Sequence, residues 1–175
     1  MNFFPVILQN VNRFYELGET IQAANYLLEE YELNHCNFKG FELREKAKLN
    51  FILMTAEGVF GEQQIIRIPE NTFDFDLVLM LNMLAHEMIH VNQKVAGQFV
   101  LDRNEREWQA YYEMLFHTTY PKIPNASRFH QLFFAQKALN YYKKMGKNSV
   151  LQLQYINQKL EVEKLLTSLK QAVIK

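Results

Sequence analysis

The stretch over residues 77–96 constrains the fold more than any other part of this chain. Its apolar side chains recur at spacings of three and four residues, and together they cover more than one helix face. The members are Leu77, Val78, Leu81, Leu84, Ala85, Met88, Ile89, Val91 and Val95. A helix that is apolar on most sides has to lie between other elements. The spacing therefore predicts a long core helix over residues 77–96 that ends at Gly97.

Local signals also predict where this helix begins and which helices flank it. Thr72, Asp74 and Asp76 precede it, and each can accept a hydrogen bond from a free amide of the first turn. Helical spacing of apolar residues recurs on both sides of the core stretch. The predicted flanking helices cover residues 6–15, 21–31, 103–117, 126–145 and 149–174.

Two short apolar segments before the core helix predict a β-hairpin. Residues 49–55 and 64–68 have strand character, and Gly58 and Gly61 supply a turn between them. The sequence thus predicts one α+β domain over residues 1–175 that is mainly α-helical. A small β-hairpin or sheet precedes the core helix, and a pair of helices forms the C-terminal end.

The composition argues against several classes of protein. Lys and Arg number 19, as do Asp and Glu, so no net charge favours a nucleic acid partner. The chain contains no run of 18 apolar residues and no basic leader segment, which predicts a cytoplasmic protein without a membrane span. The single cysteine, Cys36, cannot form an intrachain disulfide, and we expect it to be buried.

Two histidines and a glutamate lie on the predicted core helix, at His86, Glu87 and His90. Residues four apart are separated by about 40° around a helix, so the two imidazoles share a face and can bind one Zn²⁺. Glu87 lies beside that face, where a general base can take a proton from zinc-activated water. Two core histidines bonded to backbone carbonyls are the alternative, but this spacing arises by chance in only roughly one per cent of such chains.

A catalytic zinc site needs a third protein ligand and an open fourth position. Glu105 and Glu107 lie on the next predicted helix, about 200° apart, so only one of them can face the metal. Glu107 shares its face with Ala110, whose small side chain allows the two helices to approach closely. We therefore predict Glu107 as the third ligand and keep Glu105 as the alternative.

Two motifs now carry a resemblance to a known family. They are His86-Glu87-Met88-Ile89-His90 and Glu107-Trp108-Gln109-Ala110. Together they resemble the zincin metallopeptidases, and more narrowly the gluzincin branch, over about residues 76–113. The resemblance implies a minimal zincin-like domain in which His86, His90 and Glu107 bind one zinc ion and Glu87 is the general base.

The chain departs from the gluzincin pattern at one position near the metal. Many gluzincins place an Asp after the Glu-x-x-Ala segment, as a partner of a ligand histidine. Tyr111 occupies that position here. Asn82 and Asn92 are the candidates for orienting the histidines instead.

The resemblance implies a zinc metallopeptidase that cleaves peptide bonds in a peptide or protein substrate. If the strand over residues 64–68 lies at the sheet edge, it can pair with an extended substrate. Candidates for stabilising the oxyanion are Tyr111, Tyr112, His117, Tyr120 and His130. Two alternatives remain, namely a zinc amide or ester hydrolase of a small substrate and a non-catalytic zinc-containing binding or scaffold protein.

Overall fold

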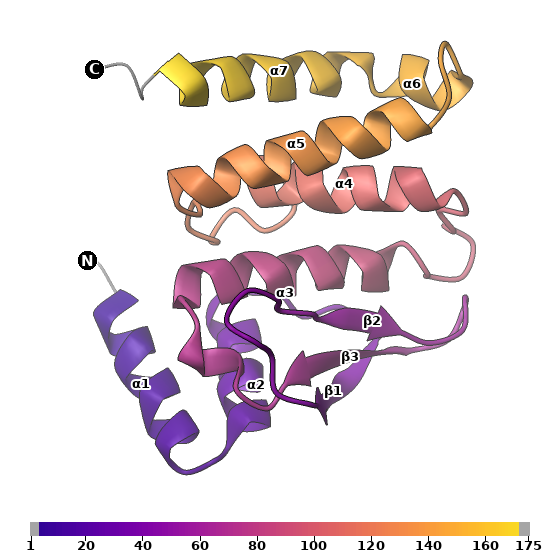
Figure 1. The fold of residues 1–175 in the computed structure, drawn as a ribbon. Helices are drawn as coiled ribbons and strands as arrows, with labels where there is room; N and C mark the ends of the chain where they lie inside the picture. The colour runs from indigo at the N-terminus through magenta and orange to yellow at the C-terminus, as the bar shows by residue number, and fades with distance from the viewer. Residues whose placement is uncertain (1–3, 172–175) are drawn as a thin grey trace.

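The computed structural model describes residues 4–171 of the 175-residue chain. In chain order its helices are α1 (Phe4–Glu16), α2 (Thr20–Glu30), α3 (Leu77–Asn92), α4 (Arg103–Phe116), α5 (Arg128–Lys144), α6 (Val150–Gln154) and α7 (Ile156–Gln171). Together with a small sheet they confirm the predicted α+β fold that is mainly α-helical. Figure 1 shows α1, α2 and the sheet on one side of α3, with the later helices stacked on the other side.

Helix α3 lies between two hydrophobic cores. The first core joins α3 to α1, α2 and the sheet, and the second joins α4, α5 and α7. Leu79 and Met83 of α3 pack against both cores. Burying one such side chain contributes about 1.5–3 kcal/mol, so a helix with apolar residues on most sides is stable in this position. None of the helices within residues 4–171 is long and apolar enough to cross a membrane.

Aspartates begin both helices that carry the candidate site. The Asp76 side chain accepts from the backbone N–H of Leu79 at 2.8 Å, which confirms Asp76 as the N-cap of α3. Asp102 does the same for α4 through the N–H of Glu105 at 2.9 Å. Each cap satisfies an amide that has no partner inside its helix.

The end of α3 at Asn92 comes four residues before the predicted end at residue 96. The backbone carbonyl of Gln93 accepts from the N–H of Val100 at 3.0 Å, because the chain has already folded back on itself. Gly97 has a φ of +81° in this turn, a conformation that favours glycine. The apolar spacing continues to Val95, so it predicts a longer helix. It does not indicate that the backbone reverses direction after Asn92.

The sheet contains β1 (Phe38–Arg44), β2 (Thr55–Glu57) and β3 (Gln64–Pro69), in the spatial order β1-β3-β2. Strand β3 pairs with β2 in antiparallel fashion, so a hairpin is present, but its first strand is not residues 49–55. Leu49 in that segment is 92% exposed. The condition for substrate pairing at residues 64–68 is not met, because β3 is the central strand and not an edge.

Strand β1 was not predicted from the sequence. It pairs with β3 in parallel, with Phe41 opposite Ile66. Parallel neighbours need a long crossover connection, so no local turn signal marks their pairing. Cys36, just before β1, is exposed, and the prediction that it is buried is wrong.

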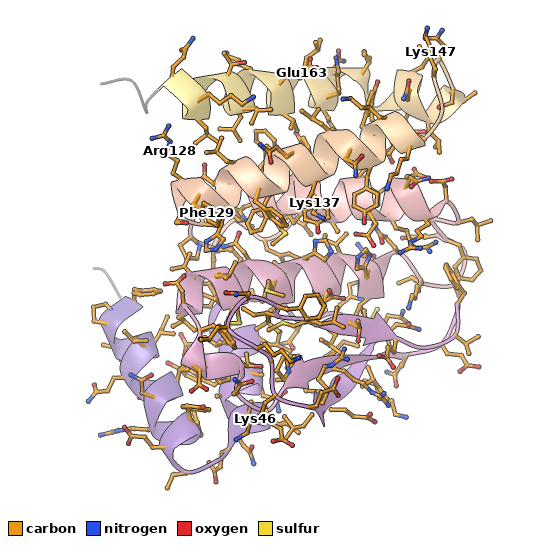
Figure 2. All side chains as sticks on the ribbon, viewed as in Figure 1. Lys46, Arg128, Phe129, Lys137, Lys147 and Glu163 are labelled. Carbon is orange, nitrogen blue, oxygen red and sulfur yellow. The ribbon has the colours of Figure 1, made fainter. Side chains whose placement is uncertain are left out.

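The C-terminal part of the described chain contains α5 and a second helical segment, as predicted, but the second segment is interrupted. It divides at Tyr155 into α6 and α7. Arg128 at the start of α5 donates from Nε to the backbone carbonyl of Leu169 on α7 at 2.8 Å, and its side chain reaches toward α7 in Figure 2. The predicted end at Ile174 lies outside the described residues.

Candidate metal centre

Helix α3 presents His86 and His90 on one face, as their spacing predicted. Their Nε2 atoms lie 3.2 Å apart, and the two rings are nearly perpendicular, at 84°. The His86 side chain is 11% exposed and the His90 side chain 14%, so both rings are largely buried but not sealed from solvent. At this distance one imidazole can donate a hydrogen bond to the other, and the two nitrogens are also close enough to bind one cation together.

Helix α4 brings the Glu107 carboxylate to the same point. Its oxygens lie 3.8 Å from Nε2 of His86 and 3.9 Å from Nε2 of His90. Ala110, one turn along α4, is completely buried, which allows the helices to approach as expected. The structure therefore brings the three predicted ligands together, and they form a group that could hold a metal ion.

Glu105, the alternative third ligand, points elsewhere. Its Oε1 accepts from the hydroxyl of Tyr155 at 2.6 Å and lies 3.5 Å from Nε2 of Gln109. Both partners are on the side of α4 that faces the C-terminal helices. This arrangement agrees with the roughly 200° that separates Glu105 from Glu107 around a helix.

The distances in this cluster fit a tetrahedral metal ion. With metal–ligand bonds of about 2.0–2.1 Å, two donor atoms of a tetrahedral centre lie about 3.3 Å apart. The 3.2 Å between the two Nε2 atoms matches this separation closely. The Glu107 oxygens are slightly farther away, and its side chain is 21% exposed, which leaves it room to approach. Two imidazoles and one carboxylate therefore fit a small divalent cation.

The protonation states of the cluster also suit a cation. Burial, and then the neighbouring His90, hold the pKa of His86 well below its ordinary value. Burial is also the main cause that lowers the pKa of His90 to about 4. Both imidazoles are therefore neutral at neutral pH and keep a lone pair for a metal. Burial raises the pKa of Glu107, while Arg103 and Arg106 oppose that rise.

Glu87 lies next to the cluster and is itself 7% exposed. Its Oε2 accepts from the backbone N–H of Ala56 on β2 at 2.7 Å. Burial raises the pKa of Glu87 to about 8, and the carboxylate of Glu107 adds to this rise, whereas the Ala56 hydrogen bond and Lys94 oppose it. A carboxyl group with a pKa near neutrality can both accept and donate a proton.

Lys94 contacts the same residue of β2. Its Nζ donates to the backbone carbonyl of Ala56 and to Oε1 of Gln64, each at 2.9 Å. The N–H and the carbonyl of Ala56 are therefore both bonded to side chains of α3 or of the turn that follows it. These two contacts fix β2 beside the cluster.

Gln93, which was not among the predicted site residues, contacts the His90 ring. Nδ1 of His90 lies 2.8 Å from Oε1 of Gln93. Neither predicted asparagine takes this role, because Asn82 donates to two backbone carbonyls and Asn92 makes no side-chain hydrogen bond among residues 4–171. Gln93 is one helical turn beyond His90, so spacing alone could have suggested it.

The environment of His86 differs from that of His90. Nδ1 of His86 is buried, and no described residue meets hydrogen-bond geometry with it. The Tyr111 ring packs against the His86 ring edge to face, with the centroids 4.7 Å apart. The backbone carbonyl of Ala110 acts on the ring as a hydrogen-bond acceptor and raises the pKa of His86, but burial, the largest cause, outweighs it.

Tyr111 is the one oxyanion candidate that the structure places in ring contact with the cluster. Burial raises the pKa of its hydroxyl, and the carboxylates of Glu107 and Glu87 add to this rise. The hydroxyl therefore lies within electrostatic range of both carboxylates and remains a proton donor at neutral pH. It makes no hydrogen bond to another residue in the described part of the chain.

None of the other four candidates is in ring contact with His86 or His90. The hydroxyl of Tyr112 donates to Glu161 on α7, and Nδ1 of His130 pairs with Ser127. His117 is buried with neither ring nitrogen bonded to a described residue, and Tyr120 is buried near Glu113. The structure thus distinguishes Tyr111 from candidates that the sequence could not separate.

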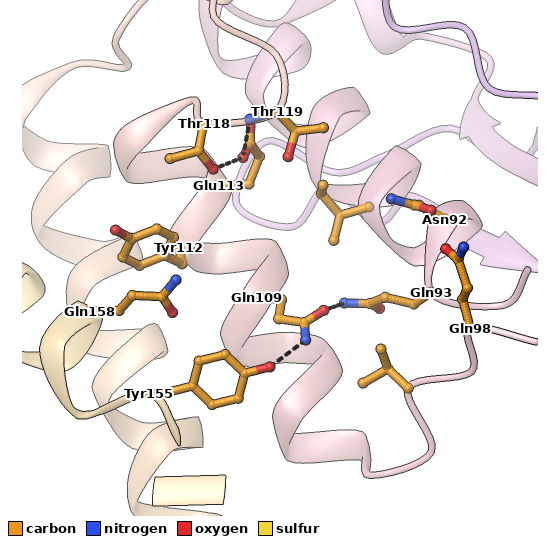
Figure 3. A pocket seen from close by; sticks show the side chains of 12 residues that line it. Asn92, Gln93, Gln98, Gln109, Tyr112, Glu113, Thr118, Thr119, Tyr155 and Gln158 are labelled. Atoms are coloured by element: carbon orange, nitrogen blue, oxygen red, sulfur yellow. Dashed lines mark hydrogen bonds between the residues drawn. The ribbon is translucent and has the colours of Figure 1, made fainter. Parts of the chain in front are cut away.

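A polar cavity of about 370 Å³ lies behind the cluster rather than over it. Carboxamides and hydroxyls line it, as Figure 3 shows, including Gln93, Gln109 and Tyr155. None of the three candidate ligands lines this cavity, and neither does Glu87. It therefore lies on the far side of the contact between α3 and α4.

Comparisons with known proteins do not assign the chain to a family. Neither a scan against protein-family models nor searches of curated proteins and solved structures finds a match to the chain. The functional argument consequently depends on the cluster itself and on the chemistry of its side chains.

Proposed function

We propose that the protein is a zinc-dependent hydrolase of the metallopeptidase type, related in its site to the gluzincin branch of the zincins. In this proposal His86, His90 and Glu107 hold one zinc ion, and Glu87 is the general base. The observation that carries the proposal is the placement of a buried carboxyl group beside a cluster of two imidazoles and a carboxylate.

The donor set supports zinc in a catalytic rather than a structural role. Imidazole nitrogen suits zinc and other transition metals, while oxygen-only sites suit magnesium and calcium. Structural zinc sites usually have four protein ligands, whereas catalytic sites have three and leave one position open. Within residues 4–171 the cluster contains three such side chains, so it has the composition of a catalytic site and disfavours the scaffold alternative.

Glu87 moves the proton in this scheme. A bound zinc ion would supply the Lewis acidity that makes water nucleophilic near neutral pH and polarises a carbonyl group. Glu87 accepts the proton that water loses when its oxygen attacks the carbonyl carbon. It then returns that proton to the leaving nitrogen as the carbon–nitrogen bond breaks, so the carboxylate is regenerated. In the metal-free protein burial raises the pKa of Glu87 to about 8, which makes it a stronger base than an exposed glutamate.

Tyr111 supplies the second donor that the developing oxyanion needs. Its hydroxyl is close to the carboxylates of Glu87 and Glu107 and has no partner among the described residues. Burial keeps it protonated. A donor that is already in place does not have to reorganise when charge develops on the substrate oxygen.

The substrate is proposed to be a peptide, because an edge strand lies beside Glu87. Strand β2, not β3, has this position, and an extended chain can add to such an edge. One observation favours the second candidate, an amide or ester hydrolase of a small substrate. At Ala56 the N–H and the carbonyl are already bonded to Glu87 and Lys94, so that residue offers no free backbone group.

The proposal is tested with zinc-loaded wild type, Glu87→Gln and the control Glu62→Gln, which changes an exposed carboxylate away from the cluster. Mass spectrometry should detect cleavage of casein or a peptide library by wild type and by the control. Glu87→Gln should keep about one zinc ion but lose hydrolysis. Hydrolysis of small amides or esters alone would support the second candidate. A zinc-loaded wild type that hydrolyses neither would overturn both.

A further inference from the structure

The amide of Gln93 joins the metal centre to the opposite side of α4. Gln93 is 4% exposed and lies just beyond the end of α3. Its Nε2 donates to the backbone carbonyl of Arg106 at 3.0 Å and to Oε1 of Gln109 at 2.9 Å. Its Oε1 faces Nδ1 of His90 at 2.8 Å. One side chain therefore connects α3, the backbone of α4 and a candidate ligand.

These contacts determine which nitrogen of His90 carries the proton. A backbone carbonyl can only accept, so the group of Gln93 that faces Arg106 must be its NH₂. The oxygen of Gln93 then faces His90, and Nδ1 of the neutral imidazole must be the donor. Nε2 is left with a lone pair that can accept from Nε2 of His86 or bind a metal ion, and it is the atom that faces His86 and Glu107.

The hydrogen bonds continue beyond Gln93 in one direction. Gln109 accepts from Gln93 and donates from Nε2 to the hydroxyl of Tyr155 at 2.7 Å. Tyr155 in turn donates to Oε1 of Glu105 at 2.6 Å. Figure 3 shows Gln93, Gln109 and Tyr155 side by side along the cavity, joined by two of these bonds. Every donor points from His90 toward the carboxylate of Glu105.

We propose that Gln93 is a positioning residue that fixes His90 for metal binding, and that Gln109, Tyr155 and Glu105 extend it into a relay. A carboxylate that accepts from a ligand histidine makes that ligand more basic and fixes its tautomer. Glu105 increases the basicity of His90 through the intervening hydrogen bonds, because each bond in an aligned chain polarises the next. The relay links the metal centre to the junction of α6 and α7. The inference depends on the metal-binding part of the proposed function and not on hydrolysis.

The tautomer of His90 is the first measurement, and it uses the metal-free protein. Long-range ¹H–¹⁵N spectra should show a protonated Nδ1 in wild type, and Gln93→Met should shift His90 toward protonation at Nε2. Gln98→Met is the matched control, because Gln98 lines the same cavity but is exposed and has no side-chain bond among the described residues. An unchanged tautomer in Gln93→Met would overturn the role of Gln93.

If Gln93→Met does not fold, a second variant tests the same assignment. Gln93→Glu still accepts from His90 but cannot donate to Arg106 or Gln109. We expect it to keep the Nδ1–H tautomer, and a shift to Nε2–H would contradict the assignment. If wild type binds no zinc, the proposed function fails, but these spectra still decide whether Gln93 orients His90.

Zinc affinity, measured by competition with a chelator, tests the full relay. Gln93→Met should weaken zinc binding by about 10- to 100-fold, the usual effect of losing a partner of a ligand histidine, while Gln98→Met should not. Tyr155→Phe removes one hydroxyl and should weaken binding less, on the order of threefold. Wild-type affinity in Tyr155→Phe would limit the positioning role to Gln93 and overturn the relay. Wild-type affinity in Gln93→Met would overturn both.

Discussion

The carboxylate of Glu87 accepts a hydrogen bond from the backbone N–H of Ala56 at 2.7 Å, so the proposed general base is joined to the edge strand β2. This bond stabilises the charged carboxylate and lowers its pKa, whereas burial destabilises the charge and raises it. Burial dominates, and the resulting pKa of about 8 is well above the ordinary 4.5. The Ala56 amide therefore limits how far burial raises the pKa of Glu87.

Removal of that amide should raise the pKa of Glu87 further. Ala56→Pro deletes the N–H that faces Glu87, and an edge strand tolerates proline. ¹³C NMR titration of the Glu87 carboxyl in metal-free protein should show a pKa above that of wild type, because burial is then opposed by one bond fewer. Ala56→Gly keeps the N–H and should leave the pKa near 8. A pKa that falls in the proline variant would contradict this account.

The raised pKa of Glu87 should make the metal-free protein less stable in mild alkali. Between pH 4.5, the ordinary pKa, and about pH 8, folded Glu87 binds a proton that the unfolded chain has lost. The stabilisation from this proton is complete below the ordinary pKa and disappears as pH rises through the folded pKa.

Urea unfolding in the presence of EDTA measures this effect between pH 6.5 and 8.5 as the difference between wild type and Glu87→Gln, because the histidines, whose ordinary pKa is about 6.5, titrate alike in the two proteins. The free energy of unfolding of wild type should fall by about 1.4 kcal/mol per pH unit where the full proton difference persists. Glu87→Gln has no such proton and should show a much flatter dependence. Parallel curves for the two proteins would show that Glu87 is ionised when folded.

The two glutamates of α4 should differ sharply in their effect on zinc affinity. Glu107 lies within 4 Å of both histidines, whereas Glu105 bonds to Tyr155 on the other side of the helix. Glu107→Gln removes a candidate ligand and should weaken zinc binding by at least about 100-fold. Glu105→Gln should cost only a few-fold, through the relay. A larger loss in Glu105→Gln, measured by the same chelator competition, would reverse the assignment of the third ligand.

The parts of the site that depend on local helical geometry could be predicted from the sequence. The four-residue spacing of His86 and His90 places both rings on one face, and the face that Glu107 shares with Ala110 indicates which carboxylate of α4 meets them. Asp76 was recognised as an N-cap candidate because its partner is three residues away. In each case the relevant neighbours lie within two turns of one helix.

The parts that depend on contacts between distant segments could not be predicted. Strand β1 pairs with β3 across a long connection, so the sequence left open whether β3 is an edge strand. Ala56 meets Glu87 from 31 positions away. Gln93 is close to His90 in sequence, but its second partner, the Arg106 carbonyl, is available only once α4 has packed against α3. Periodicity carries no information about such pairings.

Tyr111 should contribute to the rate of hydrolysis without contributing to zinc binding. Tyr111→Phe keeps the ring that packs on His86 and removes only the hydroxyl near the two carboxylates. Loss of one oxyanion donor typically lowers kcat by about 10²–10³-fold, and we expect KM and zinc content to stay near wild type because the donor acts on the transition state. Tyr112→Phe is the matched control, since the neighbouring hydroxyl donates to Glu161 on α7. Equal kcat values in the two variants would remove Tyr111 from the reaction and leave its ring as a packing partner of His86.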